Sequence, residues 1–195
     1  MSNILKRGLF HIVVGLSIAM AAWFLPRRVL LISMGATAFI WLAFELLRLR
    51  YAGINSWFFS WFRSLLREEE TSRLTGASYM LVGCLIAFLV FPRDIAVLAI
   101  CFLAVGDVAA SVVGTYLGRR RALGKTVEGN SACFVSCVAI GFILYYADLD
   151  IRPLAILLGS VAAAIAEAMP LLIDDNLTIP LFAGLVMTAV MTLVV

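Results

Sequence analysis

Charged residues are scarce in this sequence, and their scarcity narrows the class of protein. Lys, Arg, Asp and Glu together make up 14% of the 195 residues, whereas hydrophobic residues make up 64%. Soluble domains average about 25% charged and about 45–50% apolar residues. This composition excludes a soluble domain and predicts an integral membrane protein, for which we expect no nucleic-acid partner.

The sequence also lacks the patterns of a zinc or redox centre. Its cysteines lie within apolar stretches and do not have zinc-type spacing, so we interpret them as small packing residues. They are Cys84, Cys101, Cys133 and Cys137. The single histidine, His11, lies about a turn into an apolar run. A lone histidine is more often a packed residue than a ligand.

Long apolar runs recur along the whole chain and predict a bundle of about seven membrane-spanning helices, since one span needs about 20 apolar residues. The predicted spans cover residues 8–25, 29–47, 74–91, 95–118, 131–147, 154–173 and 180–195. The sequence contains no internal repeat or linker. The predicted fold class is therefore all-α, a polytopic membrane bundle with a single domain over residues 1–195.

An amphipathic segment separates the second and third predicted spans. Its apolar residues follow the i, i+3, i+4, i+7 pattern of a helix that is apolar on one face, and Arg63 and Arg67 fall off that face. The apolar residues are Ile54, Trp57, Phe58, Trp61, Phe62, Leu65 and Leu66. We predict an interfacial helix over residues 54–67 that lies in the headgroup layer. A membrane anchor is favoured over a substrate gate.

Lys and Arg are divided unevenly between the two ends of the predicted spans. One side receives only Arg27, Arg28, Arg93 and Arg152. The other receives Lys6, Arg7, Arg48, Arg50, Arg63, Arg67, Arg73, Arg119, Arg120, Arg121 and Lys125. By the positive-inside rule, the N-terminus and the loops after the second, fourth and sixth spans face the cytoplasm. In a prokaryote this membrane would be the cell membrane.

Asp107 lies inside a predicted span, in the segment GDVAASVVGTYLG. An ionisable side chain within a span is costly, and is a functional candidate for that reason. Small residues recur at every fourth position from Gly106 to Gly118 and predict close approach of a neighbouring helix. Ser111 and Thr115 continue a polar stripe from Asp107. The alternative is an aspartate that a partner helix simply neutralises, and we favour the functional interpretation.

The segment GRRRALGKTVEG, residues 118–129, is close to a phosphate-binding loop. A P-loop has four residues between its glycines and follows a strand, whereas here five residues separate Gly118 from Gly124 after an apolar run. Glycines beside Lys125 let backbone N–H groups approach phosphate oxygens. The nearby acids are Asp107, Glu128 and Asp174 or Asp175. Such acids and bases are typical of phosphoryl or nucleotidyl transfer; the alternative is binding of anionic lipid headgroups.

For the other charged residues in the predicted spans, both a structural and a functional interpretation stay open. Glu45 and Arg48 are either a local ion pair or part of a site. Glu167 and Asp174 lie on one helical face if Pro170 only kinks its helix. We expect Pro180 to start the last helix.

Four stretches of the chain together resemble the CTP-dependent polyprenol kinase family, which includes dolichol kinase, phytol kinase and the CTP-dependent diacylglycerol kinase of fungi. They are KRGLFH, EEETSRLTGASYMLVG, GDVAASVVGTYLGRRRALGKTVEG and EAMPLLIDDNLTIPL, and they span nearly the whole chain in family order. The third stretch is the most specific, and it is also distantly similar to phosphatidate cytidylyltransferases. The basic pair stands as Lys6-Arg7 where the family has Arg-Lys.

The resemblance implies roles for individual residues. It implies that Asp107, Lys125 and Glu128 are catalytic. The implied nucleotide-binding residues are Lys6, Arg7, Gly114, Arg119, Lys125, Thr126, Gly129 and Asn176. The implied metal ligands are Asp107, Glu128 and Asp175.

The activity that the resemblance implies is transfer of the γ-phosphoryl group of CTP, with Mg²⁺ as cofactor, to the hydroxyl of a polyprenol, phytol or diacylglycerol-type lipid. The expected partners are CTP, a membrane lipid alcohol and the bilayer, and a homodimer is left open. One alternative is a CTP-dependent phospholipid cytidylyltransferase. Another is a small membrane transporter or lipid-binding scaffold, which is disfavoured because the motifs gather on one face, whereas a pathway needs polar residues at both ends.

Overall fold

The computed structural model describes residues 3–122, 124–170 and 173–193, and these residues are almost entirely helical. The helices are α1 (Asn3–Phe24), α2 (Arg27–Arg50), α3 (Ala52–Phe62), α4 (Gly76–Val90), α5 (Arg93–Cys101), α6 (Val108–Leu117), α7 (Val127–Tyr146), α8 (Pro153–Ala168) and α9 (Asp175–Leu193). The shorter elements are the 3-10 turn η1 (Glu68–Thr71), the π-helical segment η2 (Phe102–Asp107), and the strands β1 (Arg121–Ala122) and β2 (Lys125–Thr126). Parts of the predicted spans 154–173 and 180–195, and Leu123 of the predicted phosphate loop, lie outside the described residues.

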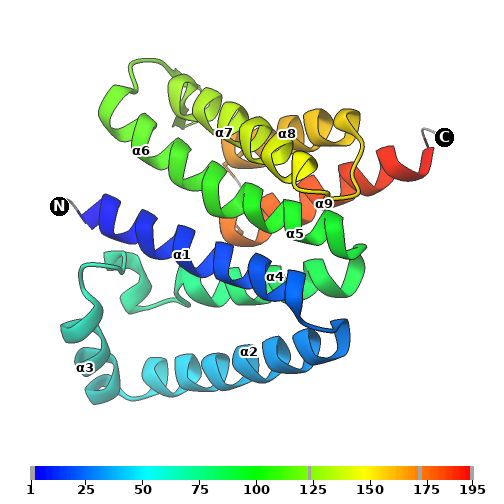
Figure 1. Ribbon diagram of the computed structural model, residues 1–195. Coiled ribbons are helices and arrows are strands. Elements are labelled where there is room, and N and C mark those ends of the chain that lie inside the picture. Colours follow the sequence, from blue (N-terminus) through cyan, green and yellow to red (C-terminus); the bar gives the residue numbers. More distant parts are fainter. Residues whose placement is uncertain (1–2, 123, 171–172, 194–195) are drawn as a thin grey trace.

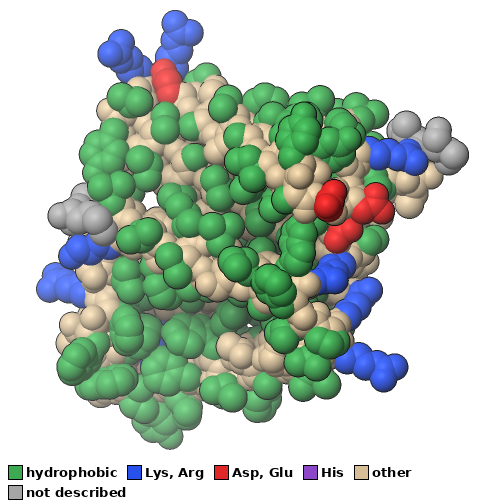
Figure 2. Space-filling view, viewed as in Figure 1, with side chains coloured by type: hydrophobic (Ala, Val, Ile, Leu, Met, Phe, Trp, Pro, Cys, Tyr) green, Lys and Arg blue, Asp and Glu red, His purple; other side chains and the backbone are tan. Residues whose placement is uncertain are grey.

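The prediction of an all-α membrane bundle is confirmed. Within the described residues, five helices are long and apolar enough to cross a membrane: α1, α2, the continuous α5–η2–α6 helix, α7 and α9. The shorter apolar helices α4 and α8 lie where two further spans were predicted, and the count of about seven stays a prediction. In Figure 2, hydrophobic side chains cover the middle of the visible face, and charged side chains gather toward its edges.

Three predicted boundaries were wrong. α8 ends at Ala168, before Pro170, because the residue preceding a proline is pushed out of the helical region; Met169 is extended. The last helix begins at Asp175, so Pro180 lies inside it and does not start it. The amphipathic helix α3 is shorter than predicted, since it ends at Phe62 and the chain then turns.

The helix α5 forms the centre of the bundle. Every residue from Ile95 to Cys101 is buried, and α5 packs against α1, α4 and α9. Figure 1 shows α1 crossing in front of α4, with α2 and α3 on one side of the molecule and α6 to α9 on the other. α2 packs mainly against α4 and exposes apolar residues on its outer face, among them Ile32 and Phe39. Such a face suits contact with lipid tails.

Small residues bring α6 and α7 close together, as the spacing in the sequence predicts. A Cβ atom at Gly106 would lie 2.6 Å from the sulfur of Cys137, and one at Gly114 would lie 2.7 Å from Oγ1 of Thr126. On the facing helix, a Cβ at Gly129 would lie 2.7 Å from the carbonyl oxygen of Ala110. Side chains at these glycines would separate the helices. The cysteines are all buried, which agrees with their interpretation as packing residues.

Candidate functional site

Asp107 lies at the end of the π-helical segment of the central helix. A π-bulge inserts an extra residue into a helical turn, and such bulges are frequent at functional sites. The Asp107 carboxylate Oδ2 lies 3.5 Å from Nδ1 of His11 on α1, at the outer limit of a hydrogen bond. Nε2 of His11 is buried and has no hydrogen-bond partner. The lone histidine is therefore packed beside the acid that the sequence singles out.

A cavity of about 230 Å³ opens beside this pair. Its polar lining includes Arg7, His11, Asp107, Arg67 and Asn176. Its apolar lining comes from α1, α2, α3, the 63–66 turn, α4 and α6, and comprises Ile4, Phe10, Trp41, Phe58, Phe62, Leu65, Leu66, Ala77, Met80, Val108 and Val112. We call this space the amphipathic cavity.

Lys125 forms the second polar centre. Its Nζ lies 2.7 Å from Oδ2 of Asp175 at the start of α9 and 3.0 Å from Oε1 of Glu167 near the end of α8. Burial lowers the pKa of Lys125, but the hydrogen bond and charge of Asp175, together with the charge of Glu167, more than offset this effect and raise the pKa. The ammonium group therefore stays charged at neutral pH. Glu167 Oε2 is buried without a partner.

A short hairpin carries Lys125 to this position. β1 pairs with β2 in antiparallel register, with Arg121 opposite Thr126, and Gly124 takes the positive φ of +88° that the turn requires. Thr126 then caps α7 by accepting a hydrogen bond from the amide of Gly129. The segment whose sequence is close to a P-loop is thus a β-hairpin followed by a capped helix.

The carboxylate of Glu128 points to the backbone of the same loop. Its oxygens accept hydrogen bonds from the amides of Arg119 and Arg120, at 3.1 to 3.3 Å. Glu128 thereby joins the end of α6 to the beginning of α7. In this arrangement Glu128 shapes the loop.

The start of α9 is held by its own side chains and by α4. Asp174 accepts a hydrogen bond from the amide of Asn176, which is an N-cap arrangement. A Cβ at Gly76 would lie 3.0 Å from Nδ2 of Asn176, and one at Gly83 would lie 2.7 Å from its carbonyl oxygen. The glycines of α4 therefore allow Asn176 to approach closely. Oδ1 of Asn176 is buried and has no partner.

A second cavity, of about 260 Å³, lies on the Lys125 side and is lined mainly by polar groups. Its charged lining residues are Arg67, Glu69, Glu70, Arg73, Lys125, Asp174 and Asp175. We call this space the polar cavity. Arg67 and Glu70 line both cavities, and an ion pair of 3.7 Å joins Arg67 to Asp174. The segment between α3 and α4 therefore borders both spaces.

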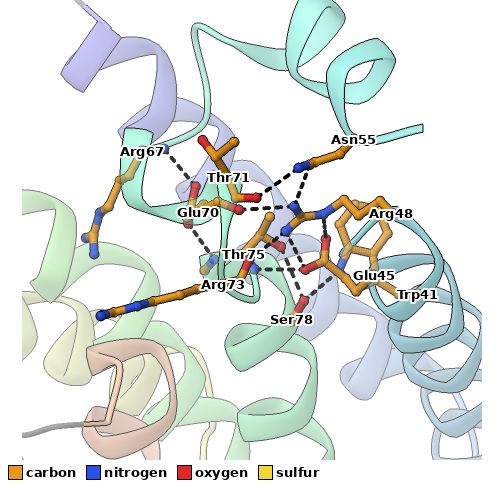
Figure 3. Close-up of polar contacts among 11 residues, drawn as sticks. Trp41, Glu45, Arg48, Asn55, Arg67, Glu70, Thr71, Arg73, Thr75 and Ser78 are labelled. Atoms are coloured by element: carbon orange, nitrogen blue, oxygen red, sulfur yellow. Dashed lines mark hydrogen bonds and ion pairs between the residues drawn. The ribbon is translucent and has the colours of Figure 1, made fainter. Parts of the chain in front are cut away.

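The same segment is anchored by a buried ion pair, drawn in Figure 3. The guanidinium of Arg48 donates to both carboxylate oxygens of Glu45, at 2.8 and 2.9 Å, and both side chains are fully buried. Arg48 also donates to the carbonyl oxygens of Glu70 and Arg73. Glu45 accepts from the amide of Thr75. The pair is local in sequence, yet it fixes a segment that begins about 20 residues later.

Glu70 completes the link between the buried pair and the cavities. One of its carboxylate oxygens accepts from the amide of Arg67 and the other from the amide of Gly76, both at 2.7 Å. These bonds, drawn in Figure 3, hold the backbone at Arg67, whose side chain lines both cavities. The position of Arg67 is therefore set by the backbone around it.

The structure brings some of the predicted site residues together and leaves others apart. Asp107, Arg7 and Asn176 line the amphipathic cavity, and Lys125 and Asp175 line the polar one. Lys6, adjacent to Arg7, is exposed and lines neither cavity. Gly114, Thr126 and Gly129 lie in the α6–α7 contact, and the Arg119 side chain is exposed. Their roles in nucleotide binding remain predictions.

A magnesium ion fits this site only together with phosphate ligands. Among the described residues, no group of three or more His, Cys, Asp or Glu side chains is placed to hold a metal. Magnesium in phosphoryl transfer is usually held by one or two carboxylates and the substrate phosphates. Asp175, which lines the polar cavity beside Lys125, is a carboxylate that suits this requirement, whereas Asp107 lines the amphipathic cavity. Glu128 is engaged with backbone amides.

Sequence reasoning missed several side chains of the site. The sequence pattern assigns Arg67 to the polar face of an interfacial helix and does not single out Glu70. The expectation that His11 is a packed residue agrees with its position beside Asp107. Sequence reasoning also did not predict the contact between the carboxylate of Glu167 and the ammonium group of Lys125. One feature of the sequence could have pointed to Glu70. Glu70 and Gly76 both lie in EEETSRLTGASYMLVG, one of the stretches that carry the family resemblance.

Comparison with known proteins finds related sequences but no related structure. No family model matches the chain, and no solved structure matches it. An uncharacterised protein of Rickettsia prowazekii is 28% identical over 90% of this chain and 89% of its own length. CTP-dependent diacylglycerol kinase 1 of Saccharomyces cerevisiae is 27% identical, over 75% of this chain and 59% of the enzyme.

The corresponding kinase of Schizosaccharomyces pombe is 30% identical over 65% of each chain. The chain therefore spans less than two thirds of the length of these fungal enzymes. The similarities support a relationship to CTP-dependent lipid kinases, as the motifs of the sequence predict. They cover most of the bundle described above.

Proposed function

We propose that the protein transfers the γ-phosphoryl group of CTP to the hydroxyl of a membrane lipid alcohol, and that the acceptor is of the diacylglycerol type. The observation that carries this proposal is the meeting of an amphipathic cavity and a polar cavity at Arg67 and Glu70. A lipid kinase needs two such spaces, one for an apolar acceptor and one for charged phosphates. The choice of CTP and of diacylglycerol rests on the names of the fungal relatives.

The phosphates of the nucleotide bind in the polar cavity. Lys125, Arg67 and Arg73 supply positive charge there, and phosphate oxygens compete with Asp175 and Glu167 for the Lys125 ammonium. Mg²⁺ bound with the nucleotide would neutralise phosphate charge, and Asp175, which lines the polar cavity, would hold it together with the phosphates. The exposed Arg119 to Arg121 raise the local concentration of the anionic nucleotide.

In the transfer step, the lipid oxygen forms a bond to the γ-phosphorus while the bond to the β-phosphate oxygen breaks and CDP leaves. The hydroxyl proton passes to the carboxylate of Asp107, which lines the amphipathic cavity. His11, which lines the same cavity, has its Nδ1 3.5 Å from this carboxylate. The donors on Lys125 and Arg67 stabilise the charge that develops on the phosphoryl oxygens. We also propose that this face of the bundle is cytoplasmic.

The test uses purified protein in lipid nanodiscs with diacylglycerol and CTP labelled in either the γ or the α position. Label from γ-labelled CTP should enter the lipid, and Asp107→Asn should lower this transfer by at least about 10³-fold while the protein still inserts and folds. Transfer of α-label would instead show a cytidylyltransferase. Near-normal transfer by Asp107→Asn would disprove the role of the carboxylate.

A further inference from the structure

We infer that the η1–α4 side of the polar cavity is a subsite for the nucleobase of the donor, in which Tyr79 contacts the face of the ring and Glu69 accepts a hydrogen bond from its exocyclic amino group. This subsite rests on the proposed function and deepens it, because it assigns the choice of nucleotide to particular side chains. The alternatives are a cavity that holds phosphates alone, and a base that lies in solvent.

The place where the two cavities meet sets the direction of the nucleotide. In the proposed reaction the γ-phosphorus has to reach the acceptor, so it lies near Arg67 and Glu70, which line both cavities. A nucleoside triphosphate is an extended molecule, and its base therefore lies against residues that line the polar cavity alone. On the η1–α4 side these residues include Glu69, Arg73 and Tyr79.

Apolar side chains also line the polar cavity, and phosphates do not account for them. Leu74 and Tyr79 lie on its η1–α4 side, and Met169, directly after α8, lines it as well. Leu74 and Tyr79 are half-buried, so they keep apolar surface that a ligand can cover. The flat face of a nucleobase stacks on an aromatic ring, and a thioether makes favourable contacts with ring edges. This part of the lining therefore suits a base.

Glu69 and Arg73 offer an acceptor and a donor on the same side of the cavity. Both side chains are exposed, and neither forms a hydrogen bond or an ion pair with another described residue. Their backbones are fixed, because the carbonyl oxygen of Glu69 accepts from the amide of Ser72 and that of Arg73 accepts from Arg48. In Figure 3 the Arg73 side chain extends away from the buried ion pair, as Arg67 does. Both polar groups are therefore available to a ligand.

A carboxylate and a guanidinium group distinguish the bases by their polar edges. Cytosine carries an amino group that donates to a carboxylate, and next to it ring and carbonyl acceptors that suit a guanidinium group. Uracil has an oxygen in place of the amino group, so it would face the Glu69 carboxylate with an unpaired acceptor. Adenine also carries an amino group, but its second ring has to fit between Tyr79 and the other apolar side chains. The polar pair therefore rejects uracil, and the apolar wall rejects purines.

The first experiment compares two neighbouring glutamates of η1 in the full-length protein in lipid nanodiscs. Glu69 lines the polar cavity, whereas the adjacent, exposed Glu68 lines neither cavity. Glu69→Gln should lower the ratio of kcat/KM for CTP to kcat/KM for UTP by at least about tenfold, because the amide can donate to the uracil oxygen. The KM for diacylglycerol should not change. Glu68→Gln is the control and should keep the wild-type ratio.

A second pair of variants tests the contact with the ring and does not depend on Glu69. Tyr79→Ala should raise the KM for CTP by about tenfold and increase the use of ATP relative to CTP, because it opens space for a purine. Tyr79→Phe keeps the ring and should retain most of the affinity that Tyr79→Ala loses. A loss in Tyr79→Phe as large as that in Tyr79→Ala would overturn the stacking role of Tyr79.

A binding measurement without turnover separates the subsite from the proposed function. Calorimetric titration with CDP and UDP, in the absence of diacylglycerol, should show at least about tenfold tighter binding of CDP to the wild type, and Glu69→Gln should remove this preference. If no lipid is phosphorylated but this pattern is found, the proposed function fails and the subsite stands. If lipid is phosphorylated from CTP but Glu68→Gln and Glu69→Gln have the same CTP-to-UTP ratio, the subsite is disproved. Equal binding of CDP and UDP to the wild type would also disprove it.

Discussion

The two acid–base clusters of the molecule differ in how completely their polar atoms are satisfied. Glu45 and Arg48 are fully buried, and the Arg48 guanidinium donates to Glu45, to Asn55 and to backbone carbonyls. Lys125 is about one third exposed, its partner Asp175 is one quarter exposed, and Glu167 keeps a buried oxygen without a partner. The second cluster also lines a cavity.

This difference indicates different tasks for similar side chains. A buried network in which every group is paired makes one arrangement far more favourable than others. In the second cluster, the partly exposed Lys125 ammonium lines a cavity and can still donate a hydrogen bond, which a phosphate oxygen can accept. The Glu45–Arg48 pair is therefore expected to hold the fold, and the Lys125 cluster to bind substrate. The predictions that follow separate stability from activity at each cluster.

The largest expected effect is a loss of protein stability when the Glu45–Arg48 pair is broken. Arg48→Met leaves Glu45 buried without its charge partner, and should lower the free energy of unfolding by about 3–5 kcal/mol. Chemical denaturation followed by circular dichroism measures this change. Arg50→Met, at the exposed end of the same helix, is the control and should change stability little. If Arg48→Met were as stable as the wild type, the structural role of the Glu45–Arg48 pair would be disproved.

The second prediction concerns activity at the other cluster. Lys125→Met removes the donor proposed to contact the nucleotide phosphates, and should lower kcat/KM for CTP by about 10²–10³-fold. The protein should unfold at nearly the same denaturant concentration as the wild type, because Lys125 is partly exposed and its acid partners can take up protons.

Arg121→Met is the matched control for Lys125, since it removes one positive charge from the same hairpin at an exposed position. It should reduce kcat/KM only slightly, through weaker attraction of the nucleotide. Equal losses in both variants would mean that the hairpin contributes general charge and that Lys125 has no specific contact.

The smallest expected effect on stability is that of replacing Arg67. Arg67 is about half exposed and pairs with Asp174 at 3.7 Å, so Arg67→Met should change the free energy of unfolding by no more than about 1 kcal/mol. Its loss should still reduce kcat, because Arg67 lines both cavities. Arg63→Met, exposed in the same segment, should leave kcat unchanged. A large loss of stability in Arg67→Met would assign Arg67 to the structural cluster.

Local patterns in the sequence predict much of this fold correctly. The positions of the long apolar helices follow from span length, and the small residues from Gly106 to Gly118 predict the close α6–α7 contact that the structure contains. The single acid in the central span leads directly to Asp107. These features depend on residues close together along the chain, so periodicity and composition reveal them.

Other features depend on residues that are distant in sequence. Lys125 meets Asp175 across 50 positions, and Arg67 meets Asp174 only because a buried ion pair fixes the turn that carries it. α9 begins at Asp175, before Pro180, and packs along α8 and α4. A sequence pattern does not specify which helix ends lie side by side.

The sequence by itself therefore determined the membrane class, the helical bundle and the residue types of the proposed phosphate-binding site. Hydrophobic content and local spacing carry that information, because they set which segments leave water and how closely two helices approach. Only the tertiary structure decided that Asp107 belongs to an amphipathic cavity and Lys125 to a polar one. Packing of helices from both ends of the chain forms those spaces, and Arg67 and Glu70 line both of them.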